Sequence, residues 1–290
     1  MRLADCDIFR IPVGPGSIHV ERYGYGGGAV VLLHGFGTSS FLWRRIAPEL
    51  ALAQNTAFAL DLLGYGASDR PVDADFGVRS QALYLERALS ALGLARPTIV
   101  GCDIGAVIAL RLAFDDPNRV SRLVLVSPSE IHELPGPHIR LMQRQTAKHV
   151  FTLARGLFGA EPLVRALLET SLSDPSSLTP LLVGRFVAPY LGRQGVNHLL
   201  ALARALEEDD LEDLSLAAIQ HPTLVLRGTA DRWCTEAHAQ LLQAELPNAR
   251  IESISEAGRL LGEERPEVLS EAILAHLAVE APAPETEATH

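Results

Sequence analysis

The segment TIVGCDIGAVIALRLAF, residues 98–114, contains the pattern that decides the fold of this chain. Thr98–Cys102 is a short, strongly apolar run, which is typical of a buried parallel strand. Ile104–Phe114 has the composition of a helix that follows directly. Between them, glycines flank Asp103 in a G-x-[nucleophile]-x-G pattern. Such a strand-to-helix turn is tight and strained, and it pushes its central side chain into a crevice. The alternative is that Asp103 only caps the helix, a position that aspartate favours.

On both sides of this segment, strand patterns alternate with helix patterns. A Gly-Pro-Gly turn at residues 14–16 predicts a hairpin between the first two strands. The other alternations predict a mostly parallel sheet with right-handed crossovers, and therefore an α/β fold. We expect strands at Asp7–Val13, Ser17–Tyr23, Ala29–Leu33, Thr56–Leu60, Val120–Val126, Thr223–Arg227 and Arg250–Ile254, and helices at Ser40–Leu50, Val78–Leu92, Glu236–Leu246 and Pro266–Ala278.

The alternation stops near residue 127 and resumes near residue 223. The segment between them shows only helical patterns, at His138–Phe158, Pro162–Leu172, Leu178–Val187 and Val196–Leu206. An insertion at the carboxyl end of a parallel strand lies over the ligand crevice. We therefore predict a core of residues 1–128 and 219–279, a helical cap of residues 129–218, and a disordered tail of residues 280–290. The acidic run at residues 207–213 is interpreted as a solvated surface between cap and core.

Composition and charge exclude several classes of function. The 290 residues carry 25 basic and 35 acidic side chains, a net charge of −10, which argues against nucleic-acid binding. The chain lacks the apolar run of about 20 residues that a membrane span needs. Its three cysteines match no zinc spacing, and they suggest a reducing compartment. We expect a cytoplasmic protein without metal or cofactor that acts on a small molecule and has no nucleic-acid or membrane partner.

Four further segments have chemical meaning because each follows a predicted strand. They are HGFG at residues 34–37, DLLGYGASDRP at 61–71, GTAD at 228–231, and EAGR at 256–259 followed by EERP at 263–266. Together with residues 101–105, and in this order, they resemble the α/β-hydrolase superfamily. With an aspartate at the centre of this turn, the chain resembles the branch that contains epoxide hydrolases and haloalkane dehalogenases.

The resemblance implies a set of site residues and an α/β-hydrolase fold with a helical cap. Asp103 would be the nucleophile, and the N–H groups of Phe36 and Ile104 would form the oxyanion hole. Asp231 would be the acid that orients a histidine. In such enzymes the carboxylate forms an alkyl ester, which water then cleaves at the ester carbonyl.

The chain departs from this pattern where the family carries its histidine base. Arg259 occupies that position, and residues 250–266 contain no histidine. A guanidinium stays protonated and cannot act as a general base. Three uses of Arg259 are open: an ion pair with Asp231, a contact with Asp103 that holds it ionised, or binding of a substrate carboxylate or oxyanion.

Other residues are weaker candidates for the substrate pocket. His34 lies in the HGFG loop, Trp43 in the next helix, and Tyr190 is the one tyrosine of the cap, where epoxide hydrolases use tyrosines. A replacement base could come from the cap histidines, which are His132, His138, His149 and His198. Glu130 could replace Asp231 as the acid.

These residues lead to one principal hypothesis and two alternatives. The principal one is an enzyme acting on a small, largely apolar substrate, with Asp103 as acid/base or electrostatic catalyst in a non-hydrolytic step such as cyclisation, isomerisation or elimination. The first alternative is an epoxide or carbon–halogen hydrolase with a relocated base. The second is a catalytically silent ligand-binding protein.

Overall fold

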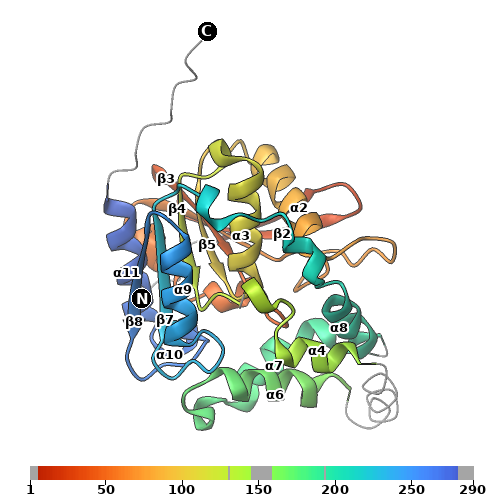
Figure 1. The fold of residues 1–290 in the computed structure, drawn as a ribbon. Coiled ribbons are helices and arrows are strands. Elements are labelled where there is room, and N and C mark those ends of the chain that lie inside the picture. Colours follow the sequence, from red (N-terminus) through yellow and green to blue (C-terminus); the bar gives the residue numbers. More distant parts are fainter. Residues whose placement is uncertain (1–5, 130, 145–158, 193, 280–290) are drawn as a thin grey trace.

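A single eight-stranded sheet forms the centre of the molecule (Figure 1). The computed structural model describes residues 6–129, 131–144, 159–192 and 194–279. The strand order is β1-β2-β4-β3-β5-β6-β7-β8. β1 and β2 are antiparallel to their neighbours, and β3 to β8 are parallel. The strands are β1 Cys6–Pro12, β2 Ser17–Tyr23, β3 Gly28–Leu33, β4 Asn55–Leu60, β5 Thr98–Cys102, β6 Arg122–Val126, β7 Thr223–Gly228 and β8 Ala249–Ile254.

The α-helices of the described residues cover the sheet or form the group between β6 and β7. They are α1 Ala47–Leu52, α2 Val78–Ala91, α3 Ile104–Asp115, α4 Pro137–Gln143, α6 Glu161–Ser171, α7 Pro180–Val187, α8 Gly195–Arg204, α9 Glu236–Glu245, α10 Leu261–Glu264 and α11 Pro266–Ala278. Short 3-10 helices are η1 Ser40–Trp43, η2 Pro117–Arg119, η3 Ile131–Glu133, η4 Pro175–Ser177, η5 Ala188–Tyr190, η6 Glu208–Leu211 and η7 Leu216–Ala218.

Burial follows the apolar pattern of each element. β5 and β6 are buried along their whole length, as central parallel strands should be. α2 buries Val78, Ala82, Leu85 and Leu89 on one face, and it packs on α3, which is buried nearly all round. On the other side, α1 contacts α11. The predicted α/β class with a mostly parallel sheet is therefore confirmed.

One predicted helix begins later than its pattern suggested. Residues 40–50 were expected to form one helix, but the chain forms η1 and then starts α1 at Ala47. Pro48 lies in the first turn of α1. Proline lacks the N–H that a helix interior needs, so it is tolerated at the start of a helix and interrupts one further along. The expected helix His138–Phe158 is described only over α4, and residues 145–158 lie outside the described part.

Helices α4, α6, α7 and α8 lie together beyond one end of the sheet (Figure 1). In the described residues between β6 and β7 there is no strand. The return to the core passes the start of α2, where the Asp210 carboxylate accepts the N–H of Val78 at 2.7 Å. Asp213 pairs with Arg79 and Arg111, each at 2.6 Å. The acidic run lies at the surface, as expected, and its carboxylates also bind a helix start and two arginines.

Candidate active site

Asp103 sits at the sharp turn between β5 and α3. Its φ of 55° is in the left-handed region, which a non-glycine residue rarely adopts. The flanking glycines are required by close backbone approaches. A Cβ on Gly101 would lie 2.3 Å from the Gly105 carbonyl oxygen, and one on Gly105 would lie 2.5 Å from the His34 carbonyl oxygen. Strain of this kind persists where the surroundings over-determine the backbone, and it often marks a functional residue.

Both oxygens of the Asp103 carboxylate are bound inside the protein. Oδ2 accepts the Phe36 backbone N–H at 2.8 Å. Gly35 leaves room for this contact, because a Cβ there would lie 2.8 Å from Oδ2 and 2.6 Å from the Asp103 Cβ. Oδ1 accepts the Ser129 hydroxyl and one N–H of the Arg259 guanidinium. Asp103 is only 6% exposed, so these groups replace water as its partners.

Of the three uses of Arg259 that the sequence left open, the structure shows the contact with Asp103. Its Nη2 contacts Asp103 Oδ1 and also donates to the Ser129 hydroxyl at 3.1 Å. Burial disfavours its charged form, but the carboxylates of Asp103 and Asp231 outweigh this and raise the pKa of the Arg259 guanidinium. The Nε atom of Arg259 has no hydrogen-bond partner among the described residues. A buried cation of this kind needs a negative partner, and Asp103 supplies it.

Asp231 follows β7 and keeps one oxygen without a partner. Oδ1 accepts the backbone N–H groups of Trp233 at 2.8 Å and Cys234 at 3.1 Å. Oδ2 is buried and has no hydrogen-bond partner among the described residues. The structure records no ion pair between Asp231 and Arg259. An unpaired buried carboxylate oxygen is costly, and here it lies in the loop where the family pattern would place a histidine against it.

The loops that carry Asp231 and Arg259 are hydrogen-bonded to each other. Ala230 donates its N–H to the Ala257 carbonyl at 2.9 Å. A Cβ on Gly228 would lie 2.1 Å from the same carbonyl oxygen, so this glycine lets the two loops touch. The relative position of residues 231 and 259 is therefore set by backbone contacts rather than by their side chains.

The end of α6 is hydrogen-bonded to the loop that carries Arg259. The Ser171 carbonyl accepts the N–H groups of Arg259 at 2.7 Å and Leu260 at 3.2 Å. The Glu264 carboxylate accepts the N–H of Ser173 at 2.8 Å and the N–H of Gly258 at 2.7 Å. The three contacts of Ser171 and Ser173 hold the helical layer closed over Asp103, and the contact with Gly258 fixes Glu264 within its own loop.

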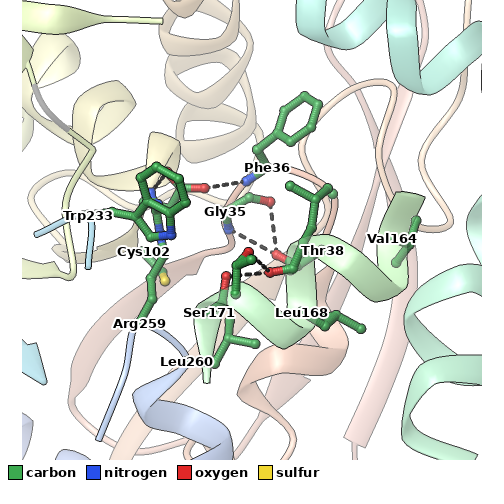
Figure 2. A pocket seen from close by; sticks show the side chains of 14 residues that line it. Gly35, Phe36, Thr38, Cys102, Val164, Leu168, Ser171, Trp233, Arg259 and Leu260 are labelled. Atoms are coloured by element: carbon green, nitrogen blue, oxygen red, sulfur yellow. Dashed lines mark hydrogen bonds and ion pairs between the residues drawn. The ribbon is translucent and has the colours of Figure 1, made fainter. Parts of the chain in front are cut away.

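A small cavity remains beside Asp103 within the described residues. Its volume is about 30 Å³, which holds no more than one or two water molecules. Figure 2 shows Arg259 and Trp233 on one side and the α6 side chains Val164 and Leu168 on the opposite side. Thr38, Leu260 and Cys102 also line it. Its wall is mostly apolar, with the Asp103–Arg259 pair as the charged group.

The family follows from comparison with known proteins. A family model described as alpha/beta hydrolase fold matches residues 28–266. The chain belongs to this family. It is 30% identical to a 2-hydroxy-6-oxononadienedioate/2-hydroxy-6-oxononatrienedioate hydrolase of Paraburkholderia xenovorans, over 93% of this chain and 94% of the relative.

Solved structures extend the comparison to the branch that the sequence resembles. A loop variant of the haloalkane dehalogenase DbeA from Bradyrhizobium elkanii matches with a TM-score of 0.79 and 25% identity, covering 95% of this chain and 97% of that one. The epoxide hydrolase CorEH matches with a TM-score of 0.79 over 94% and 99%, and at 21% identity it shows the fold alone. The resemblance to the epoxide hydrolase and dehalogenase branch of the α/β hydrolases is confirmed.

Other expected site residues of this α/β hydrolase lie away from the cavity. The Ile104 N–H makes no recorded hydrogen bond with the Asp103 carboxylate, unlike the Phe36 N–H. His34, Trp43 and Tyr190 are each at most 1% exposed, and none lines the cavity. Trp43 Nε1 and the Tyr190 hydroxyl have no hydrogen-bond partner among the described residues. The three side chains are therefore packed in the core and do not form the cavity wall.

His34 supports the loop that carries Phe36. Its Nε2 accepts the Leu62 N–H at 3.0 Å, so its Nδ1 carries the proton and donates to the Gly35 carbonyl at 2.8 Å. Burial lowers the pKa of His34. The neutral ring therefore joins the HGFG loop to the segment after β4, which positions the N–H that binds Asp103.

The cap does not bring a described histidine to Asp103. His132 pairs with Glu245 at 2.8 Å near the surface, and His198 donates to the Gly64 carbonyl at 2.6 Å. His149 and Glu130 lie outside the described residues, and so does the side chain of His138. Relocation of the base and of the acid stays a prediction for these three positions.

Two residues that sequence reasoning did not select complete the site. Ser129, just after β6, donates to Asp103, and Trp233 lines the cavity. Ser129 adjoins Glu130, so the end of β6 could have suggested it. Trp233 lies two residues after Asp231, in the turn that binds Asp231 Oδ1. Neither residue belongs to a sequence motif. Each reaches the site only because it follows the carboxyl end of a strand.

The described residues contain neither a metal-binding cluster nor a membrane-spanning helix. No group of three or more histidine, cysteine, aspartate or glutamate side chains in ranges 6–129, 131–144, 159–192 and 194–279 could hold a metal ion. Within those ranges, the helices are too short or too polar to cross a bilayer.

Three buried histidines and one half-buried histidine predict a loss of stability in mild acid. Burial lowers the pKa of His34, His198, His221 and His276. In the unfolded chain their pKa is about 6.5. As pH falls, these histidines are protonated in the unfolded chain before they are protonated in the folded protein. Their contribution to the stability of the fold is therefore complete above about pH 6.5, and it is lost as pH falls through their lower pKa values in the folded state. His19 has the opposite effect, because its hydrogen bond with Glu21 raises its pKa, but it is only one histidine against four.

We expect the Tm to fall by more than about 4 °C between pH 7 and pH 5. Thermal unfolding in buffers of equal ionic strength measures it. His276→Gln should flatten the profile, since it removes one of the four groups. His132→Gln, at an exposed histidine, is the control and should leave the slope unchanged. A flat wild-type profile over this range would contradict the prediction.

Proposed function

We propose that this α/β hydrolase-fold enzyme catalyses a non-hydrolytic step on a small, largely apolar substrate. In this proposal Asp103 transfers a proton and Arg259 stabilises negative charge on the substrate. The observation that carries it is the contact between the Arg259 guanidinium and Oδ1 of Asp103. Oδ1 is the oxygen that would have to attack carbon, because Oδ2 is held by the Phe36 N–H.

The ester cycle of the related hydrolases fits this arrangement poorly. A nucleophilic Oδ1 would have to leave both Arg259 and the Ser129 hydroxyl before reaching an electrophilic carbon. Water would then need a general base, and Arg259 cannot supply one. General-base assistance contributes about 10²–10⁴-fold to a rate. A hydrolytic cycle would lack this factor at its second step.

Proton transfer at carbon fits the same groups better. Asp103 Oδ1 would take a proton from a carbon beside a carbonyl, and the electron pair of that C–H bond would move to the carbonyl oxygen. Arg259, freed from Oδ1 as the carboxyl becomes neutral, would hold the oxyanion. Return of the proton to another carbon completes an isomerisation, and expulsion of a leaving group completes an elimination.

The cavity restricts what can enter. A volume of about 30 Å³ admits no organic substrate, so α6 must move away from the Arg259 loop. The contacts to break are those of Ser171 and of Ser173 with Glu264. The apolar walls of Val164, Leu168 and Leu260 favour a largely apolar molecule over a highly charged one.

A catalytically silent ligand-binding protein is the second candidate. The observation in its favour is that Asp103 is fully paired and the cavity is small. A hydrolase with a relocated base is less favoured, because no described histidine side chain lines the cavity. In the proposal Asp103 moves a proton, in the hydrolase it forms an ester, and in the silent protein it does neither.

Deuterium exchange into a small ketone tests the proposal without knowledge of the natural substrate. We expect the wild type in D₂O to accelerate exchange at the carbons beside the carbonyl of cyclohexanone, followed by NMR. Asp103→Asn should lower the rate above background by about 10²-fold or more, since it removes the base. Glu267→Gln, an exposed carboxylate on α11, is the control and should not change the rate.

Two other outcomes would replace the proposal. Binding of the ketone without exchange would support the silent protein. Multiple turnovers of styrene oxide or 1-bromobutane by the wild type would support a hydrolase with a relocated base. Exchange that persists in Asp103→Asn would remove Asp103 from the catalytic role.

A further inference from the structure

A hollow lies at the edge of the sheet opposite Asp103. It is formed where β3, β5 and β6 begin, and the turn of residues 93–97 and the end of α11 complete its wall. Asp103 follows the carboxyl end of β5, so the sheet separates the two places. In Figure 1 the end of α11 lies at the far end of the sheet from the cap helices. The volume of the hollow is about 410 Å³.

Two arginines in its wall have no carboxylate partner among the described residues. Arg122 is 7% exposed, and its recorded contact is a donation from Nη1 to the His276 carbonyl at 3.2 Å. Arg96 has a buried Nε without a hydrogen-bond partner in the described part of the chain. The residues that line the hollow include no aspartate or glutamate. By contrast, the equally buried Arg111 pairs with Asp115 and Asp213.

The surroundings of the hollow respond to this uncompensated positive charge. Burial lowers the pKa of the Arg122 guanidinium. Burial also lowers the pKa of His221, and the charge of Arg96 lowers it further. Burial likewise lowers the pKa of His276, and the charges of Arg250 and then Arg122 add to this effect. A buried charge without a counterion is unfavourable. Although the chain has a net charge of −10, no carboxylate lines this hollow, and an anion would supply the missing counterion.

We propose that this hollow binds a small organic anion through a phosphate or carboxylate group held by Arg96 and Arg122. Guanidinium groups bind the oxygens of either group in a fork geometry. The hydroxyls of Thr98 and Ser121, 3.3 Å apart, line the same wall and can add hydrogen bonds. The volume falls in the range of small-molecule sites and exceeds that of a lone ion. Apolar Leu94, Pro97 and Leu277 would contact the rest of the ligand.

Calorimetric titration of the full chain tests this binding site. The probes are inorganic phosphate, adenosine monophosphate and succinate, in chloride buffer at constant ionic strength. We expect at least one probe to bind, and Arg96→Gln and Arg122→Gln each to weaken it by about 10- to 100-fold. Arg165→Gln, which removes the same charge from α6, should bind as the wild type does, and so should Asp103→Asn. Tighter binding of the nucleotide or of succinate than of phosphate identifies an organic ligand and its acidic group.

Several outcomes would overturn the proposal. They are the absence of binding by all three probes, tighter binding of inorganic phosphate than of both organic probes, and equal weakening in Arg165→Gln, which would indicate a general charge effect. If Arg122→Gln does not fold, Arg96→Gln still decides, because Arg96 is only partly buried. Unchanged affinity in Arg96→Gln, or loss of binding in Asp103→Asn, would also refute this location.

Discussion

Arg259→His is expected to turn over simple epoxides, which the wild type should not do. Removal of the guanidinium leaves the Ser129 hydroxyl as the remaining donor to Oδ1 of Asp103. The new imidazole would lie in a loop bonded to that of Asp231, whose Oδ2 has no partner among the described residues and can accept its N–H. A histidine with an orienting carboxylate and a pKa near neutrality suits a general base. We expect a rate about 10²-fold or more above the wild type.

The chemistry of this variant can be followed atom by atom. Oδ1 attacks an epoxide carbon, the C–O bond of the ring breaks, and a hydroxyalkyl ester forms once the former epoxide oxygen takes a proton from water. The Phe36 N–H then holds Oδ2, the ester carbonyl oxygen on which charge develops when water attacks. The product diol carries away Oδ1. In ¹⁸O-labelled water, label should therefore appear in Asp103 after one turnover, as peptide mass spectrometry can show.

Two companion variants make this experiment decisive. Arg259→Gln removes the guanidinium charge from Asp103 but supplies no base, so it should accumulate the Asp103 ester as a stable mass adduct. The double variant Asp103→Asn/Arg259→His should neither form the adduct nor turn over. If Arg259→Gln forms no adduct and Arg259→His shows no hydrolysis, Asp103 is not a latent nucleophile, and its likeness to the hydrolase nucleophile is only structural.

The second large effect is on stability. We expect Arg259→Met to lower the free energy of unfolding at pH 8 by about 3–5 kcal/mol. The substitution leaves two buried carboxylates, Asp103 and Asp231, without their cation. Urea denaturation measures the change. Arg165→Met, at a partly exposed arginine of α6, should stay within about 0.5 kcal/mol of the wild type.

The pH dependence of this effect follows from the sign of the linkage. Without Arg259, burial and mutual repulsion would raise the folded pKa of the carboxylates. The variant is then more stable at low pH, and it loses stability as pH rises through the raised pKa values. The difference in unfolding free energy between Arg259→Met and the wild type should therefore be smaller at pH 5 than at pH 8. The double variant Asp103→Asn/Arg259→Met should cost less than the sum of the single changes. Additive costs and a constant deficit would mean that the ion pair does not stabilise the fold.

Sequence patterns predicted most elements to within two residues, because apolar runs and helical spacing act locally. β5, the turn at Asp103 and α3 were all evident in residues 98–114. The helix before β4 starts later than its apolar pattern predicts, because Pro48 favours the first turn of a helix. The motifs also placed the chain in the α/β hydrolases and identified Arg259 as the departure from their pattern.

The partner of Arg259 was decided only by the tertiary structure. Two carboxylates lie within its electrostatic influence, Asp103 and Asp231, and the motif does not distinguish between them. The choice depends on how loops from β5, β6, β7 and β8 meet at one edge of the sheet, which also brings in Ser129. The same holds for His34, Trp43 and Tyr190, whose burial away from the cavity depends on packing between distant segments. Local sequence determines strands, helices and turns, whereas the contacts of a buried side chain depend on the three-dimensional arrangement of residues far apart in the chain.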